Sequence, residues 1–160
     1  MLIIYRILSF FINFIGFFIA VSLVVIIPIF ITVPVFWLPM FLIIAVVLYT
    51  WFSNKFRIKV LIRREAVNHN LRDWIRVNGL VAIIFTMLNI PSIINIIRNP
   101  AAYFKATEDF AKQFGQGTNQ TLTPGSIHLI TSVMLLYLIA LFVHVFWTLT
   151  LVKRNQDLFQ

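Results

Sequence analysis

The chain has 160 residues, no cysteine and a net charge of +8, and 61% of its residues are hydrophobic. Ordinary soluble domains are about 45–50% apolar, so this composition indicates a membrane protein. The absence of cysteine excludes disulfides, thiolate metal ligands and cysteine nucleophiles.

Three stretches, 7–54, 77–97 and 113–152, contain no Asp, Glu, Lys or Arg. A helix needs about 20 apolar residues to cross a bilayer core of about 30 Å. The first stretch is long enough for two crossings, and each of the others holds one. We therefore predict an all-α membrane protein, a four-span helical bundle in a single transmembrane domain, 1–160. The predicted spans are about 7–27, 34–52, 77–97 and 127–152.

Prolines divide the first apolar stretch into a predicted helical hairpin, because proline removes a backbone donor and clashes with the preceding turn. We place a short outer turn near 30–33, with Pro34 opening the second span. A re-entrant first segment is the alternative. Trp37 at one end of the second span, and Tyr49 with Trp51 at the other, are predicted to lie in the interfacial aromatic belts.

The segment 53–76 is predicted to be a basic cytoplasmic loop, which either begins with the alternating pattern of 56–60 or prolongs the second span as a helix into the cytoplasm. Lys and Arg accumulate in short cytoplasmic loops, and of the 13 in this chain only Arg98, Lys105 and Lys112 fall on the opposite side. Both termini are then cytoplasmic, and topology accounts for the charge without nucleic-acid binding. The loop either sets orientation alone or also contacts anionic lipid headgroups or a protein partner. Its candidate contact residues are Lys55, Arg57, Lys59, Arg63 and Arg64.

Two asparagines mark predicted helix starts. Asn70 resembles the first residue of a capping box and would begin a helix that continues as the third span. Asn99 followed by Pro100 is a typical cap and first helical residue. The helix predicted over 100–114 is amphipathic and is expected to lie in the outer membrane interface, within the outer segment 98–126.

Polar and small residues share one face on three of the predicted spans. The three sets are Ser9, Asn13, Gly16 and Ala20; Asn78, Ala82, Thr86 and Asn89; and Tyr137, Ala140, His144 and Thr148. At about 1.5 Å per residue, Asn13, Thr86 and His144 lie about 9, 13 and 12 Å from the inner ends of their spans. We therefore hypothesise one hydrogen-bonded intramembrane cluster made by Asn13, Thr86, Asn89 and His144.

This cluster has two interpretations. Small residues let membrane helices approach closely, and polar side chains bond across them, so the cluster can serve packing alone. Gly16 and Ala20, four residues apart, fit that use. The other interpretation is a site for a ligand or a proton, because polar groups inside hydrocarbon are often functional.

Catalytic and cofactor chemistry has little support in the sequence. No predicted span contains an acidic residue, and no phosphate-binding glycine loop or metal-spaced cluster is present. His128 and His144 are on one predicted helix, about 24 Å apart by rise, so one chain cannot supply both axial ligands of a haem there. A symmetric dimer pairing two copies of His144 can. We predict no catalytic residue, no metal site and no cofactor.

The sequence therefore favours a non-enzymatic accessory or scaffolding subunit of a larger inner-membrane complex. Its partners would be other membrane protein subunits and anionic lipid headgroups, with docking through the first two spans and the basic loop. One alternative is a small transporter or channel formed by self-association, with the polar cluster lining the path. Another is a haem- or quinone-binding electron-transfer subunit.

Overall fold

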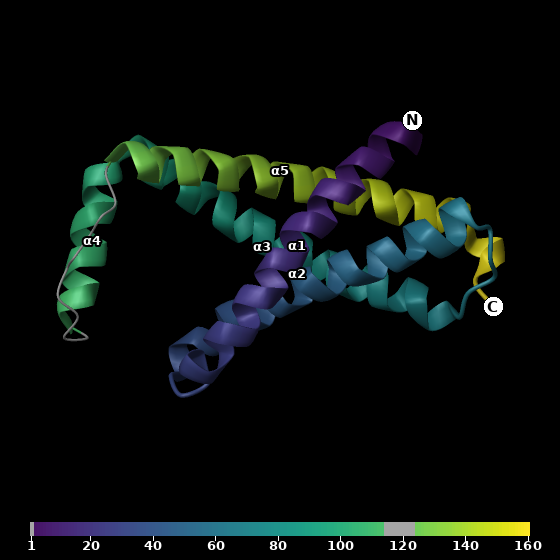
Figure 1. The fold of residues 1–160 in the computed structure, drawn as a ribbon, viewed down its shortest axis with the longest axis horizontal. Helices are drawn as coiled ribbons and strands as arrows, with labels where there is room; N and C mark the ends of the chain where they lie inside the picture. The colour runs from purple at the N-terminus through teal and green to yellow at the C-terminus, as the bar shows by residue number, and fades with distance from the viewer. Residues whose placement is uncertain (1, 114–123) are drawn as a thin grey trace. The chain divides into compact units, whose positions relative to one another are not determined.

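The computed structural model of the chain describes residues 2–113 and 124–160. Their α-helices are α1 (Leu2–Phe30), α2 (Trp37–Phe56), α3 (His69–Arg98), α4 (Pro100–Gln113) and α5 (Pro124–Arg154) (Figure 1). Four helical segments are long and apolar enough to cross a membrane, and the shortest has 26 residues. That length corresponds to about 39 Å, more than the hydrocarbon core requires. The predicted all-α, four-span fold is confirmed, and the chain is a multi-pass membrane protein.

The chain divides into two compact units. The first contains Met1–Thr86 and Ala140–Gln160, and the second contains Met87–Ile139. Helices α3 and α5 each contribute residues to both units. The single domain over 1–160 stays a prediction.

The first unit begins with the predicted hairpin. Helix α1 ends at Phe30, and a short 3-10 turn, η1 (Pro34–Phe36), leads directly into α2. The indole Nε1 of Trp37 donates to the backbone oxygen of Ile31 over 3.1 Å, which ties the start of α2 to the end of α1. The turn therefore lies where the prolines placed it.

Helix α2 does not end at the predicted boundary. It continues as one π-helical stretch, η2 (Arg57–Ile62), and only 63–68 separate that stretch from α3. The helix extends because apolar residues continue past the span: Phe56 and Val60 are fully buried. The predicted loop 53–76 is thus mostly helical.

Helix α3 begins at His69, earlier than predicted, because Asn68 supplies the cap. Its Oδ1 accepts from the backbone N–H of Asn70 over 2.8 Å, which leaves Asn70 inside the first turn.

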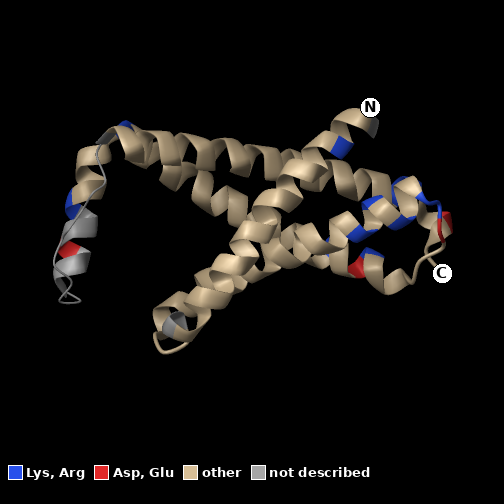
Figure 2. Ribbon diagram, viewed as in Figure 1, with Lys and Arg blue, Asp and Glu red and all other residues tan. Residues whose placement is uncertain are grey.

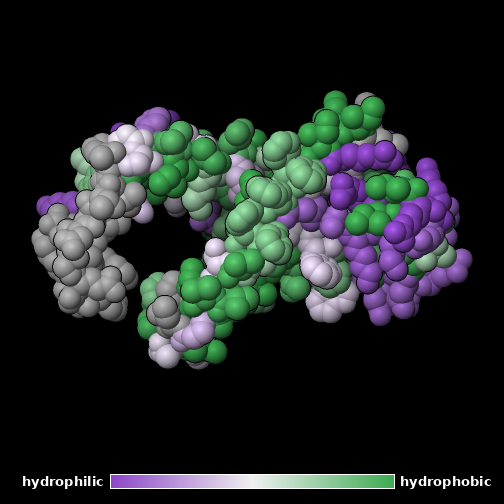
Figure 3. Space-filling model, in the orientation of Figure 1, coloured by the Kyte–Doolittle hydropathy of each residue, from purple (hydrophilic) through white to green (hydrophobic). Residues whose placement is uncertain are grey.

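Most of the basic residues of the first unit gather at one end of it, which Figure 2 shows in blue. We call this the basic end: Lys55, Arg57, Lys59, Arg63, Arg64, Arg72, Arg76, Lys153 and Arg154. Figure 3 shows the contrast between this hydrophilic end and the hydrophobic face of α1. The charge pattern is therefore strongly polarised along the helices of this unit.

The C-terminal residues fold back onto the basic end. Val67 N–H donates over 2.8 Å to the oxygen of Leu158, the last residue of the 3-10 turn η3 (Gln156–Leu158). Gln160 N–H in turn donates to the oxygen of Val67 over 2.9 Å. The Phe159 ring stacks on Phe56 with centroids 6.1 Å apart. These contacts hold the segment 63–68 in place.

The second unit contains the amphipathic helix α4. The backbone N–H of Ala102 donates to Asn99 Oδ1 over 3.3 Å, and Pro100 is the first helical residue. This start agrees with the sequence pattern. Residues 114–123 of the predicted outer segment 98–126 lie outside the described residues, and the interfacial position of α4 stays a prediction.

Two glycines sit at close helix contacts in the first unit. A Cβ atom on Gly16 of α1 would lie 2.6 Å from Thr50 Oγ1 on α2, and one on Gly79 of α3 would lie 3.3 Å from Val145 Cγ1 on α5. Thr50 cannot turn away freely, because its hydroxyl donates to the backbone oxygen of Val47 over 2.8 Å. Ala20, the other predicted packing residue, is half-buried.

We expect Gly16→Ala to destabilise the protein more than Gly79→Ala. Alanine gains about 1 kcal/mol of helix propensity over glycine, whereas an overpacked contact costs about 1–3 kcal/mol. At Gly16 the clash outweighs the gain, and at Gly79 the two nearly cancel. Thermal unfolding in mild detergent measures which of the two variants is less stable. In a Thr50→Ala background, Gly16→Ala should cost less stability than in wild type. Equal stability of Gly16→Ala and wild type would contradict the close contact.

Candidate functional site

A buried polar network joins three helices of the first unit around His144. Ser9 Oγ on α1 lies 2.8 Å from His144 Nε2, and Tyr49 Oη on α2 lies 2.8 Å from His144 Nδ1. Tyr49 and Tyr5 also reach Thr148 Oγ1, over 3.0 and 3.1 Å. All five side chains are 0% exposed. We call these residues the His144 network.

Helical spacing explains why these residues meet. Tyr5 and Ser9 are four residues apart on α1, and His144 and Thr148 are four apart on α5, so each helix presents a pair on one face. Tyr49 reaches the same place from α2. The Tyr5 ring stacks on the imidazole with centroids 5.2 Å apart and planes 5° from parallel, while Tyr49 meets it edge-on at 76°. The imidazole is therefore enclosed by aromatic rings as well as hydrogen-bonded.

Each hydroxyl has one hydrogen, and this fixes the direction of the bonds. Thr148 donates to the backbone oxygen of His144 over 2.8 Å, and Tyr49 donates to Thr148. Tyr49 Oη therefore accepts from His144 Nδ1–H. In a neutral imidazole the other ring nitrogen is an acceptor, so Nε2 accepts from Ser9. Both nitrogens of His144 are thereby engaged.

The structure brings His144 together with residues other than those in the predicted cluster. Asn13 Nδ2 donates to the backbone oxygen of Ser9 over 2.6 Å, and Thr86 Oγ1 donates to that of Ile83 over 2.8 Å. Asn89 belongs to the second unit and is half-buried. Counting residues from the inner end of each span gives the depth of Asn13 and Thr86, but not the partner to which each side chain bonds. Short polar side chains readily bond to the carbonyl of the preceding turn of their own helix. The predicted bonding of His144 to Asn13 or Thr86 is therefore corrected to Ser9 and Tyr49.

Sequence reasoning missed both tyrosines of the network. Tyr49 was expected at the membrane interface but is fully buried, whereas Trp51, predicted to lie there too, is 71% exposed. The spacing of Tyr5 from Ser9 was an available signal, since it repeats that of His144 and Thr148. The shared face of His144 and Thr148 was recognised.

The basic residues predicted as contacts have different surroundings. Arg57 Nη2 donates to Asn54 Oδ1 over 2.7 Å, Arg63 pairs with Glu65 at 3.5 Å, and Arg64 Nη1 donates to Asn155 Oδ1 over 3.2 Å. In contrast, Lys55 and Lys59 line two surface hollows of about 400 and 300 Å³.

No protein family matches this chain, and no curated protein or solved structure matches it either. The class of the protein therefore rests on its own fold and site: a multi-pass helical membrane protein with a closed polar network in its first unit.

We expect Tyr49→Phe to cost more stability than Tyr5→Phe. Tyr49→Phe leaves a buried ring nitrogen of His144 without a partner, and such a loss costs about 1–3 kcal/mol. Tyr5→Phe removes one of the two bonds that Thr148 accepts, and interhelical bonds in membranes average about 0.6 kcal/mol. Thermal unfolding of both variants and of His144→Leu tests the order. Strictly additive losses in a Tyr49→Phe/His144→Leu double variant would contradict direct coupling.

Tyr137 provides a matched control in the second unit. Its hydroxyl is buried with no hydrogen-bond partner among the described residues. Removing an unsatisfied buried group relieves a desolvation cost, so Tyr137→Phe should leave stability unchanged or raise it by about 1 kcal/mol. A loss of stability comparable to that of Tyr49→Phe would mean that removing a tyrosine hydroxyl lowers stability whether or not the hydroxyl is hydrogen-bonded.

Proposed function

We propose that this protein is a non-enzymatic accessory or scaffolding subunit of a larger complex in the inner (plasma) membrane. The observation that carries the proposal is the closure of the His144 network. Its hydroxyl and imidazole groups bond to one another, and none of the five side chains is exposed. A network of this kind fixes helices against each other, as polar groups between membrane helices commonly do.

The face of α1 supplies the proposed docking surface for another membrane subunit. Phe10, Phe14 and Phe18 recur every fourth residue and are each more than half exposed. Their rings touch in sequence, with centroid distances of 6.3 and 5.0 Å. Aromatic side chains bury a large area at little entropic cost. This row of rings therefore suits contact with a partner helix.

The basic end supports a topology with both termini in the cytoplasm. Lysine and arginine concentrate on the cytoplasmic side of membrane proteins, and the basic end contains both the 63–68 connection and the residues that follow α5. The proposed partner can then contact this protein on its cytoplasmic side as well as within the bilayer.

The alternatives receive less support from the site. A transport path lined by His144 requires access to that residue, which is 0% exposed. Haem ligation requires a free ring nitrogen, and both nitrogens of His144 are hydrogen-bonded. Each alternative would require the network to open.

We expect the tagged protein, at native expression and in mild detergent, to co-purify a stoichiometric membrane partner identifiable by mass spectrometry. Phe14→Ala/Phe18→Ala should reduce recovery of that partner about tenfold, since burying an aromatic ring in an interface is worth more than 1 kcal/mol. Phe142→Ala/Phe146→Ala is the matched control, because these two rings on α5 also touch at a 4.9 Å centroid distance. A homo-oligomer without a partner would move the transport alternative to first place.

A further inference from the structure

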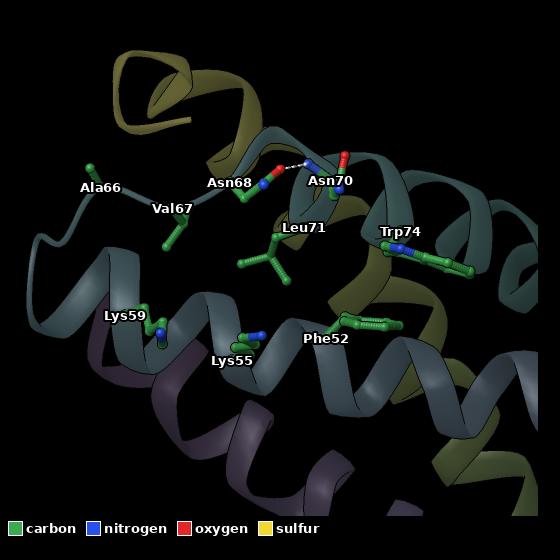
Figure 4. A pocket seen from close by; sticks show the side chains of 9 residues that line it. All are labelled: Phe52, Lys55, Lys59, Ala66, Val67, Asn68, Asn70, Leu71 and Trp74. Carbon is green, nitrogen blue, oxygen red and sulfur yellow. Dashed lines mark hydrogen bonds between the residues drawn. The ribbon is translucent and has the colours of Figure 1, made fainter. Parts of the chain in front are cut away.

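A hollow of about 400 Å³ lies at the basic end, between α2 with η2 on one side and the start of α3 on the other (Figure 4). Lys55 and Lys59 line it from the first side. Asn68, Leu71 and Trp74 line it from the second. This volume is within the range of small-molecule sites in proteins, about 300–1,000 Å³.

The two lysines have no internal partner. Neither forms an ion pair or a hydrogen bond in the part of the chain that the structure describes, and no carboxylate lines the hollow. Of the acidic residues at this end, Glu65 pairs with Arg63 and Asp73 with Arg72, whereas Asp157 in η3 forms no ion pair with a described residue and does not line the hollow. Four residues apart on one helical face, Lys55 and Lys59 present two positive charges together. The hollow therefore favours an anion.

On the side formed by α2 and η2, the lining changes from aromatic to basic in one direction. Phe52 and Trp74, on the side of the apolar spans, stack with centroids 5.5 Å apart and planes 18° from parallel. Lys55 follows Phe52 along α2, and Lys59 follows one turn later. Figure 4 shows the aromatic pair at one end of the hollow, and the lysines farther along it. A ligand matching this order has an anionic group at one end and an apolar part at the other.

The backbone wall of the hollow is held by the C-terminal residues. Val67 exchanges hydrogen bonds with Leu158 and Gln160, and His69 N–H donates to the oxygen of Gln160 over 3.1 Å. The first N–H groups of α3 are also engaged, since Asn70 N–H binds Asn68 Oδ1. Anion recognition therefore depends on the lysines rather than on the helix terminus.

We infer that this hollow binds the phosphate of an anionic phospholipid, with Lys55 and Lys59 contacting the phosphate and an acyl chain lying against Phe52 and Trp74. A soluble phosphate compound shares the phosphate chemistry, but it has no apolar part to lie against the stacked aromatic pair. The site needs no partner protein, so it goes beyond the proposed function and stands independently of it.

The test uses the full chain in nanodiscs of phosphatidylcholine with a minor fraction of phosphatidylglycerol, followed by native mass spectrometry of retained lipids. Wild type should retain phosphatidylglycerol preferentially. Lys55→Gln/Lys59→Gln should lower that preference roughly 30-fold, because each lysine near an anionic headgroup changes affinity about fivefold. Lys153→Gln/Arg154→Gln makes the same charge change outside the hollow and should keep the preference.

Three results would overturn the inference. An equal loss of phosphatidylglycerol preference in both charge variants would mean that the basic end attracts anionic lipid diffusely. No preference for phosphatidylglycerol in wild type would mean that the hollow is not a lipid site. Displacement of the lipid by inorganic phosphate or glycerol phosphate alone would make the ligand a soluble phosphate. Circular dichroism of each variant verifies folding, and both lysines lack internal bonds that their replacement could break.

Fluorescence supplies an independent measurement of the apolar end. Phosphatidylglycerol with brominated acyl chains should quench the fluorescence of Trp74. That fluorescence is obtained as the difference between the signals of wild type and Trp74→Phe. The quenching should fall in Lys55→Gln/Lys59→Gln and persist in Lys153→Gln/Arg154→Gln. Quenching that is unchanged by either pair would show that the acyl chain reaches Trp74 without help from the lysines, against the inference.

Discussion

A polar group surrounded by hydrocarbon must find its partner within the protein, because no water is available to it. The first unit meets this constraint by gathering Tyr5, Ser9, Tyr49, His144 and Thr148 into one set of mutual bonds. The same bonds fix α1 and α2 against α5. The close contact of Gly16 with Thr50 joins two of the same helices, α1 and α2, and the missing Cβ of glycine makes that approach possible.

The sequence was sufficient for the four spans, the hairpin turn and the start of α4, because these depend on length, proline and capping residues that act locally. It was not sufficient for the rotation of each helix about its axis. Depth counting put Asn13 and Thr86 beside His144, yet each bonds within its own helix. Tyr49 shows the same limit: a tyrosine near the end of a span suits an interface equally well until its neighbours are known.

The basic end combines local and distant determinants. Its charge could be recognised from the sequence, whereas the hollow beside Lys55 and Lys59 required two contacts between distant segments: the stacking of Phe52 on Trp74, and the pairing of Val67 with the C-terminal residues. Such contacts have no signature in composition or periodicity. The residues of the proposed lipid site therefore belong to the same basic set that the sequence pattern identifies, and only the structure separates the lysines left unpaired from the arginines already engaged.

The directions of the bonds around His144 have a consequence for its tautomer. From Nδ1 the hydrogens point to Tyr49, then to Thr148, and then to the carbonyl oxygen of His144 itself. The chain of donors returns to the residue where it began, and a carbonyl has no hydrogen to hand onward. Two further hydroxyls join this loop: Ser9 donates to Nε2 of the imidazole, and Tyr5 donates to Thr148. This arrangement holds the imidazole of His144 in a single tautomer, with its hydrogen on Nδ1.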